Sequence, residues 1–543
     1  MKKRNILSLA LVGTLVIGAL SACTGGTPAD PGTTTPEATP AATPAAVTPT
    51  IGSGTTPAPA PAPAPTGEAT GKIILATANE APSLTIAEHN AVAGTYMNKL
   101  TNNGLVRIDA ATLQPVPDLA VSYAPLNDLD WEFKLRDDVY FHNGDHMTAD
   151  DVVASLFWVK QFPDCVQYQM RIVNVEKVDD YTVIISTAEP SAMLLTDLAH
   201  HGNWIVPKSL IDSGHNFNAD PVGSGPYKFV NWTFGDSFDF VANDNYFDTE
   251  RAPRIKDMTW RVIPEGSSRT IALEAGEVDL IVEVATQDIP RMQADPNIEV
   301  FMTPGVGHNF MMINNEIAPF DNIIVRKALD MAIDKEALVG IGMDGLAQPI
   351  YNQVTVGFAG NTNKGTNSYD PEGAAALLAE HGIDPASITF DIICSDDAKR
   401  RCGEVIQSSL AEIGINVTLS TMDLATYLSV TADGDYEAAI GGFNSSDIMS
   451  YLNGVWHGAS VGGSNKTRTN DPEINALIDK AAATLDEAER IPILEEVCEL
   501  INLNVGQIPI YQNFMMRAYN ANLVLPELGA STDLNLNMGY WID

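Results

Sequence analysis

The stretch ITFDIICSDDAKRRCGEVIQSSLAEIGINVTLS, residues 388–420, reads as strand, helix and strand in succession. Residues 388–394 form an apolar run typical of a buried strand, residues 403–413 have helical periodicity, and residues 416–420 return to strand character. Two strands joined by a helical crossover lie parallel in one sheet. This segment therefore predicts an α/β fold that contains a parallel sheet.

The sequence on either side continues the alternation of strands and helices. Asp321 is expected to cap a helix whose apolar face runs over residues 324–333. Asp370 and Pro371 start another helix, which ends at Gly382. The other expected elements are strands at 72–76, 131–135, 181–185, 278–282 and 508–511, a hairpin at 227–241, and helices at 152–160 after a capping box at 148–151, at 268–275, and from 472 to about 506.

The first 23 residues have the parts of a bacterial lipoprotein signal peptide. A basic start at residues 2–4 precedes an apolar run at residues 6–20, which is too short to span a bilayer comfortably. An ordinary secretory signal is the alternative, but leucine three positions before Cys23 favours a lipoprotein. Residues 1–22 are therefore predicted to be removed and Cys23 to carry the lipid, which places the chain outside the cytoplasm and anchors it to the cell membrane.

Residues 24–70 consist almost entirely of proline, threonine, alanine and glycine, with no aromatic side chain. Such a composition cannot bury a core, and its Pro-Ala alternation favours an extended conformation. Residues 23–70 are thus predicted to be a lipidated linker. The remaining 473 residues exceed the size at which a single core stops growing, so two lobes are expected. No second linker interrupts them, which suggests that the chain crosses between the lobes more than once.

Charge and cysteine content exclude several classes of function. The net charge of −38 argues against nucleic acid as a partner. Four cysteines besides Cys23 indicate no disulfide framework; a bridge between Cys394 and Cys402 is open, but free buried thiols are favoured. No C-x-x-C motif supports a metal or redox site.

Two glycine motifs and two histidine pairs bear on catalysis or metal binding. Residues 458–462 match G-x-S-x-G but run into a polar loop, and residues 340–345 match G-x-G-x-x-G but follow a helix. His142 with His146, and His200 with His201, could bind a metal, but no third ligand is signalled nearby. The sequence therefore predicts no enzyme activity, no cofactor and no metal site, and surface or hydrogen-bonded histidines are favoured.

Several short motifs occur in a fixed order along the chain. They are GLVRID at 104–109, PDLA at 117–120, WEFKLRD at 131–137, FHNG at 141–144, TADDVV at 148–153, GSGPY at 223–227, AGEVD at 275–279 and VRKAL at 325–329. In this order the sequence resembles the bacterial extracellular solute-binding proteins of family 5, which serve peptide and nickel ABC importers. The similarity extends from about residue 71 to residue 523.

The resemblance implies a two-lobed clamshell of the periplasmic-binding-protein type, with solute held between the lobes. The crossings are expected near Gly307 and Gly506. Residues 71–307 and 507–543 then form the first lobe, which carries an extra α/β subdomain at about 100–215, and residues 308–506 form the second. A hinged cleft suits reversible capture, because contacts to both lobes exist only when it is closed. The implied partners are the membrane-spanning subunits of an ABC permease, and the implied state is a monomer.

The resemblance also indicates which residues line the cleft. The candidates lie in the loop after the first strand, in the turn at 223–226 and in the segment 441–456: Asn79, Glu80, Pro82, Leu84, Trp204, Gly225, Phe443, Asn444, Ser446, Asp447 and Trp456. A glycine-rich turn also has a purely structural role available.

One departure from the family bears on the solute. Peptide-binding relatives carry an aspartate that pairs with the peptide's ammonium group, after Gly-Trp and before Asp-Pro. Alignment on Asp447 puts Asn444 at that position, and alignment on Phe443 puts Ser446 there; neither is an acid. Either Asp447 itself recognises the ammonium group or the solute lacks one. Peptide is the first expectation, a nickel chelate or an oligosaccharide is the alternative, and a surface adhesion or scaffold lipoprotein is the alternative of another class.

Overall fold

The computed structural model describes residues 69–543, apart from residues 111, 446, 530–533 and 543. The predicted signal peptide, Cys23 and nearly all of the predicted linker lie outside the described residues. All described residues belong to one unit. None of the helices in the described ranges is both long and apolar enough to cross a bilayer.

An 11-stranded sheet runs through this unit, in the order β15-β14-β16-β12-β17-β11-β1-β10-β9-β8, with β13 paired beside β17. The segment 388–420 folds as expected: β14 (Thr389–Cys394) and β15 (Asn416–Thr421) are parallel and joined by α11 (Asp397–Glu412). The helix begins six residues before the expected start, because the Asp396 side chain accepts a hydrogen bond from Lys399 N at 2.9 Å. The predicted α/β class is confirmed.

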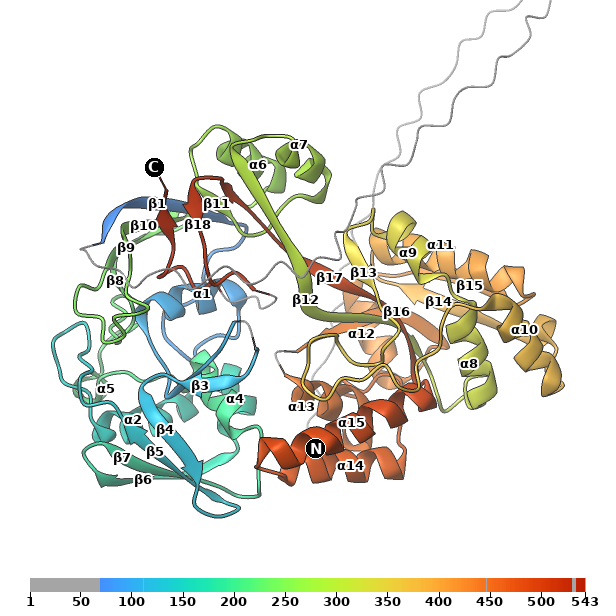
Figure 1. Ribbon diagram of the computed structural model, residues 1–543, viewed down its shortest axis with the longest axis horizontal. Coiled ribbons are helices and arrows are strands. Elements are labelled where there is room, and N and C mark those ends of the chain that lie inside the picture. The colour runs from blue at the N-terminus through green and yellow to red at the C-terminus, as the bar shows by residue number, and fades with distance from the viewer. Residues whose placement is uncertain (1–68, 111, 446, 530–533, 543) are drawn as a thin grey trace, which may run out of the picture. The chain divides into compact units, whose positions relative to one another are not determined.

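Two long antiparallel strands, β12 (Ile298–Ile313) and β17 (Gln507–Asn520), join the two halves of this sheet (Figure 1). One end of β17 pairs with β11, while residues Gly307–Ile313 of β12 pair with β16 (Ala438–Asn444). The register between β12 and β17 shifts between Pro304 and His308. The partners of both strands therefore change around this irregularity. Strand β12 pairs with β16 from Gly307 onward, whereas β17 pairs with β13 as far as Asn513 and with β11 at Ala518 and Tyr519.

The first half of the sheet carries helices on both faces. Side chains of β1 alternate between them: Ile73 and Leu75 pack with α1 (Val92–Thr101), and Ala76 packs with α6 (Gly266–Glu274) and α7 (Ile289–Gln293). The strands of this half are β1 (Thr70–Thr77), β8 (Tyr227–Thr233), β9 (Ser237–Ala242), β10 (Ile255–Val262) and β11 (Leu280–Ile281). The expected hairpin is confirmed as β8 and β9, whereas β11 is shorter than expected.

A separate four-stranded sheet, in the order β4-β5-β7-β6, has its own core between Leu105 and Ile205. The capping box that opens α2 is confirmed: the Thr148 and Asp151 side chains each accept a hydrogen bond from the other residue's backbone N–H. The elements of this region are β4 (Ala120–Pro125), β5 (Asp130–Leu135), α2 (Ala149–Trp158), α3 (Val166–Gln169), β6 (Ile172–Asp179), β7 (Thr182–Thr187), α4 (Leu194–Ala199) and α5 (Lys208–Ser213).

The second half of the sheet is also covered on both faces. In β14, Ile392 packs against one group of helices and Ile393 against the other. The first group comprises α8 (Ile323–Ala332), α9 (Lys335–Gly342), α10 (Pro371–Glu380) and α11; the second comprises α12 (Leu424–Asp433), α13 (Ile448–Tyr451), α14 (Pro472–Ala483) and α15 (Glu487–Asn504). The cap of α8 is Asn322, whose Oδ1 accepts from Ile324 N, and the expectation of Asp321 is wrong by one residue.

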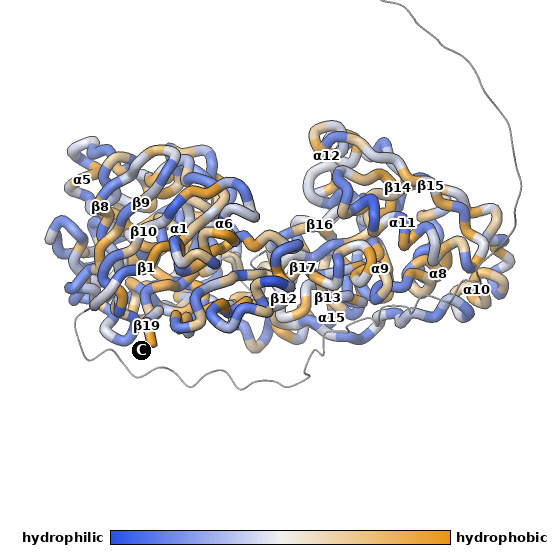
Figure 2. Tube along the Cα trace, turned by 90° about the horizontal axis from the view of Figure 1, so that it is seen from above, coloured by the Kyte–Doolittle hydropathy of each residue, from blue (hydrophilic) through white to orange (hydrophobic). Residues whose placement is uncertain are grey.

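Hydrophobic stretches of the trace, as along β14, alternate with hydrophilic ones (Figure 2).

The four described cysteines, Cys165, Cys394, Cys402 and Cys498, are free and buried, so the favoured prediction of buried thiols is confirmed. The remaining elements are β2 (Val106–Ile108), β3 (Pro115–Pro117), β13 (Ala347–Pro349), β18 (Leu523–Val524), β19 (Tyr540–Trp541), six 3₁₀ turns at 159–161, 163–165, 201–203, 286–288, 385–387 and 458–460, and a π-helix at Leu452–Trp456.

Candidate functional site

A cavity of about 550 Å³ lies where β12 and β17 change partners. We call it the crossing cavity. Three groups of residues line it: Asn90, Val92, Ile108, Leu113 and Tyr168 from the first part of the chain, Gly305–Gly307 and Asn513–Met515 from the two long strands, and Asn444 and Ser445 from the end of β16. Segments far apart in sequence thus contribute to one wall, as a solute site between two lobes requires.

Gly307 provides the space at the centre of this cavity. A Cβ atom at this position would lie 2.5 Å from Asn444 Oδ1 and 3.5 Å from Asn513 Nδ2. The two amide side chains therefore flank the glycine. A larger residue at 307 would push them apart, so glycine in this strand marks a close approach.

The lining of the crossing cavity contains no acidic or basic residue. Its polar groups are mainly amides. Within the described residues, the exposed side chains of Asn444 and Asn513 make no intramolecular hydrogen bond. Each offers a donor and an acceptor to a bound molecule.

A second cavity, of about 350 Å³, lies between the four-stranded sheet and helices α13 and α15. We call it the charged cavity, because Asp447, Asp486, Glu487 and Arg490 line it together with apolar residues such as Tyr123 and Trp131. Its two sides touch directly: Ala192 N donates to Ala482 O at 2.9 Å.

Three of the charged groups that line this second cavity have structural partners. Asp447 caps α13, accepting from Ser450 N at 2.8 Å and from Ser450 Oγ at 2.7 Å. Asp486 caps α15 by accepting from Glu489 N at 3.0 Å. Arg490 donates to Thr484 O at 3.1 Å, and burial lowers the pKa of its guanidinium. These charges therefore stabilise helix ends and a loop.

The residues predicted in the segment 441–456 fall in different places. Asn444 lines the crossing cavity, Asp447 lines the charged cavity, and Phe443 lines a third cavity with Phe310 and Tyr427. Trp456 is 1% exposed and belongs to the core of the second half. Ser446 lies outside the described residues.

The residues predicted nearer the N-terminus lie away from the crossing cavity. Glu80 Oε1 accepts from Trp232 Nε1 at 2.8 Å and from Gly235 N at 2.7 Å, which ties the loop to the β8–β9 hairpin. Leu84 is buried, whereas Asn79 and Pro82 are exposed. None of these four lines the crossing cavity or the charged cavity.

Trp204 and Gly225 have packing roles. Trp204 is 5% exposed and donates through Nε1 to Ala199 O at 3.0 Å. It borders a small cavity of about 50 Å³ beside Pro226. A Cβ atom on Gly225 would lie 2.4 Å from Leu100 O, so this turn packs tightly on the end of α1.

Sequence reasoning missed most of the crossing cavity. Asn90 closes the loop in which cleft residues were expected, but eight positions beyond Pro82. Asn513, Phe514 and Tyr168 carry no motif. The available signal was the pair Gly305 and Gly307 inside a strand, because glycine there often marks a close approach or a bulge.

His308 follows the glycine and is fully buried. Its ring lies 5.5 Å from that of Tyr451 and 5.6 Å from that of Phe310. Neither ring nitrogen has a hydrogen-bond partner among the described residues. Burial, helped by the positive charge of Lys335, lowers the pKa of His308 to about 3. The imidazole that follows Gly307 in β12 is therefore neutral at physiological pH.

Comparison with known proteins identifies the class. Residues 114–463 match the family "Bacterial extracellular solute-binding proteins, family 5 Middle". Heme-binding protein A of Haemophilus influenzae is 28% identical over 451 residues, 75% of this chain and 81% of that protein. The dipeptide-binding protein of Escherichia coli K12 is 26% identical over 431 residues, 73% of this chain and 80% of the relative.

A solved structure of HbpA2 from Haemophilus parasuis aligns with a TM-score of 0.79 at 25% identity, over 87% of this chain and all of that one. The chain belongs to the family 5 solute-binding proteins and has the fold of periplasmic binding proteins. It is an extracytoplasmic substrate-binding component of the ABC-importer type and not an enzyme.

Proposed function

We propose that the protein captures peptides in the crossing cavity and delivers them to an ABC permease, while Cys23 anchors it to the cell membrane. Membership of the solute-binding family supports this role, and the similarity to a dipeptide-binding protein supports peptide as the solute. The observation that carries the proposal is the pair of amide side chains, Asn444 and Asn513, on either side of Gly307.

Amide side chains suit a peptide backbone. Each asparagine can donate to a carbonyl and accept from an N–H of a bound chain, which satisfies groups that would otherwise be desolvated without partners. Because the lining carries no charge, a peptide held there gains no ion pair for its terminal ammonium group. Recognition therefore rests on the peptide's main chain, and a blocked N-terminus is tolerated.

Capture follows from the position of the cavity on the two long strands. We assign residues 71–307 and 507–543 to one lobe, with a subdomain at about 100–215, and residues 308–506 to the other. A peptide that contacts Tyr168 and Asn444 together holds both lobes, so its binding shifts the population toward the closed form. The closed monomer is the form that the permease recognises.

A peptide panel tests the solute. Di- to pentapeptides with free and acetylated N-termini are titrated calorimetrically, and material released on denaturation is analysed by mass spectrometry. We expect released peptides, and affinities for the two forms within about threefold, since only a weak polar contact separates them. Release of a non-peptide solute alone, or loss of binding on acetylation, would contradict this mode of recognition.

The anchor has its own test. In the Cys23→Ala variant the lipid attachment is lost, and the protein is expected to leave the membrane fraction because a lipid anchor supplies the membrane affinity. Fractionation followed by mass spectrometry of the N-terminal peptide measures both changes. Wild-type protein without a lipid on residue 23 would disprove the anchor while leaving the solute site untouched.

A further inference from the structure

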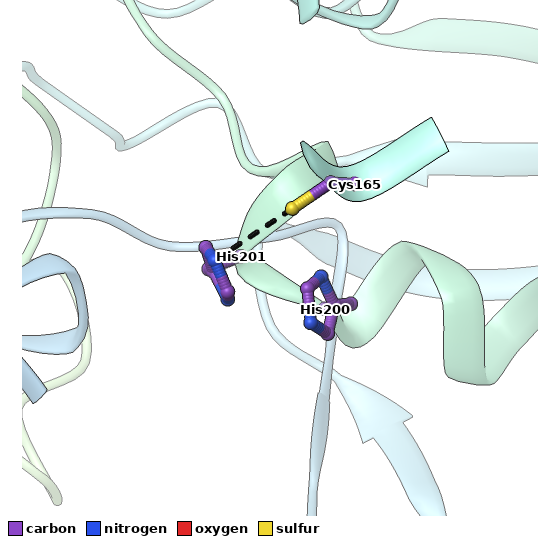
Figure 3. A group of neighbouring side chains, drawn as sticks. All are labelled: Cys165, His200 and His201. Atoms are coloured by element: carbon purple, nitrogen blue, oxygen red, sulfur yellow. Dashed lines mark hydrogen bonds between the residues drawn. The ribbon is translucent and has the colours of Figure 1, made fainter. Parts of the chain in front are cut away.

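Three side chains from two separate turns meet in the first part of the chain: Cys165 from one, and the neighbouring His200 and His201 from the other (Figure 3). Their ligand atoms, the thiol sulfur and one ring nitrogen of each histidine, all lie within 4.8 Å of one another. Cys165 Sγ is 3.9 Å from His201 Nε2. Cys165 is fully buried, His201 is 2% exposed, and His200 is half-buried.

We propose that Cys165, His200 and His201 bind one borderline-soft divalent cation, zinc first among them. Zinc bonds of about 2.3 Å to sulfur and about 2.0 Å to nitrogen, at tetrahedral angles, put the sulfur and nitrogen atoms about 3.5 Å apart. The 3.9 Å separation is close to this value. One thiolate and two imidazoles suit zinc, whereas magnesium and calcium require oxygen ligands.

Two hydrogen bonds mark the place of the cation. The His89 carbonyl oxygen lies 3.0 Å from Cys165 Sγ and 3.0 Å from His201 Nε2, so both groups donate to it in the metal-free arrangement. On binding, the thiol proton of Cys165 passes to solvent. The His201 proton moves to Nδ1, and both donor atoms become ligands.

The surroundings of His201 suit this change. Its Nδ1 lies 3.3 Å from Thr95 Oγ1, which itself donates to Ala91 O at 3.1 Å. A protonated Nδ1 can therefore donate to the threonine oxygen while Nε2 binds the metal. Such an outer hydrogen bond fixes the tautomer of a ligating histidine.

The surroundings of His200 are also compatible with metal binding. Its Nδ1 accepts from Gly202 N at 3.1 Å. A ring nitrogen that accepts a hydrogen bond carries no proton, so the ring in this arrangement is neutral, as a metal ligand must be. To bind, it either gives up the bond from Gly202 or exchanges its proton between nitrogens. His89 is not a ligand, because its Nε2 bonds Asn98 Oδ1 at 2.9 Å.

The site lies directly behind the crossing cavity. Tyr168, which lines that cavity, stacks on His200 with ring centroids 3.6 Å apart. A cation that fixes His200 therefore fixes one wall of the cavity. The metal is a resident of the protein, separate from any solute, and the inference stands whether or not the solute is a peptide.

Metal content tests the inference directly. The full chain, purified in mild detergent and stripped with a chelator, is dialysed against micromolar zinc and analysed by mass spectrometry. We expect about one zinc per chain, a higher melting temperature with zinc, and a sulfur-to-cobalt charge-transfer band after cobalt substitution. Cys165→Ser and His200→Gln are expected to lose the zinc, and Cys165→Ser the band.

Cys498→Ser is the matched control, since Cys498 is equally buried but lies in the core of the second half. It should retain the zinc and the band. Substoichiometric zinc in the wild type would overturn the inference, and so would full zinc content in both Cys165→Ser and His200→Gln. Loss of zinc in Cys498→Ser to the same extent would also count against it, whereas the peptide assays decide the solute independently.

Discussion

The crossing cavity and the charged cavity differ in what their polar groups do. In the charged cavity, Asp447 and Asp486 cap helices and Arg490 donates to loop carbonyls. In the crossing cavity, Asn444 and Asn513 have no partner within the described part of the chain. Polar groups with partners stabilise the fold, and polar groups without them are available to a ligand. This difference is our reason for proposing the cavity without charges as the solute site, although acids are the more conspicuous residues in the sequence.

The largest expected effect is a loss of folding stability when the buried, neutral His308 becomes protonated. In the unfolded chain the pKa of His308 is about 6.5, whereas burial holds it at about 3 in the folded protein. Because the folded value is depressed, this histidine costs no stability above pH 6.5 and destabilises the protein increasingly as the pH falls. Between pH 7 and pH 4 the expected loss is about 3 kcal/mol.

Urea unfolding at several pH values measures this loss. In His308→Leu the pH dependence should be shallower by that amount, whereas Asn231→Ala, a change at an exposed, non-titratable residue of β8, should keep the wild-type slope. Equal slopes in all three proteins would show that the buried region around His308, next to Gly307, tolerates charge, and the contrast between an uncharged and a charged part of the molecule would fail there.

Next in size is the effect of filling the crossing cavity. In Gly307→Leu the new side chain starts 2.5 Å from Asn444 Oδ1 and separates the two amides. We expect peptide affinity to fall about 100-fold, about 2.7 kcal/mol. The control is Gly340→Leu, at a glycine in α9 whose added Cβ meets nothing within 4 Å. Calorimetry on folded variants decides, and undiminished affinity in Gly307→Leu would place the solute elsewhere.

Removing one amide at a time should have a smaller effect. Asn444→Ala and Asn513→Ala each delete one or two neutral hydrogen bonds, so a loss of about fivefold to tenfold in affinity is expected from each. Asn231→Ala, on strand β8, serves as the control. If both cavity variants bind like the wild type, the amides do not contact the peptide.

The smallest change in affinity is expected from the charged cavity. Asp447→Ala removes the cap of α13 and should lower the free energy of unfolding by about 1 kcal/mol. Peptide affinity should change by less than about twofold. Titration with a free and an acetylated peptide distinguishes the roles: a large loss for the free peptide alone would show that Asp447 pairs with the ammonium group, and would reverse the assignment of the two cavities.

Local sequence patterns predicted the fold well where the structure of an element depends on residues close together in the chain. The capping box at Thr148 and Asp151 and the strand–helix–strand unit at 388–420 are formed by neighbouring residues, so periodicity and caps suffice. The predicted ends of helices were less accurate. At the start of α8, the adjacent Asp321 and Asn322 can both act as an N-cap, and the backbone geometry selects Asn322.

The candidate site was predicted only in part. Asn444 was named and lines the crossing cavity, whereas Trp456 and Trp204 are buried and Glu80 binds a hairpin. The sequence does not indicate whether an aromatic side chain in such a segment points into the cleft or into the core.

The sequence by itself determined the class of the protein: an α/β chain of the solute-binding family, with an expected signal peptide and linker, because these depend on local composition and on the order of motifs. Only the tertiary structure decided which polar groups meet. Asn444 and Asn513 face each other across Gly307, and Cys165 joins His200 and His201, through contacts between residues distant along the chain. Such contacts depend on how strands pair and helices pack, and the spacing of residues in a sequence does not encode them one by one.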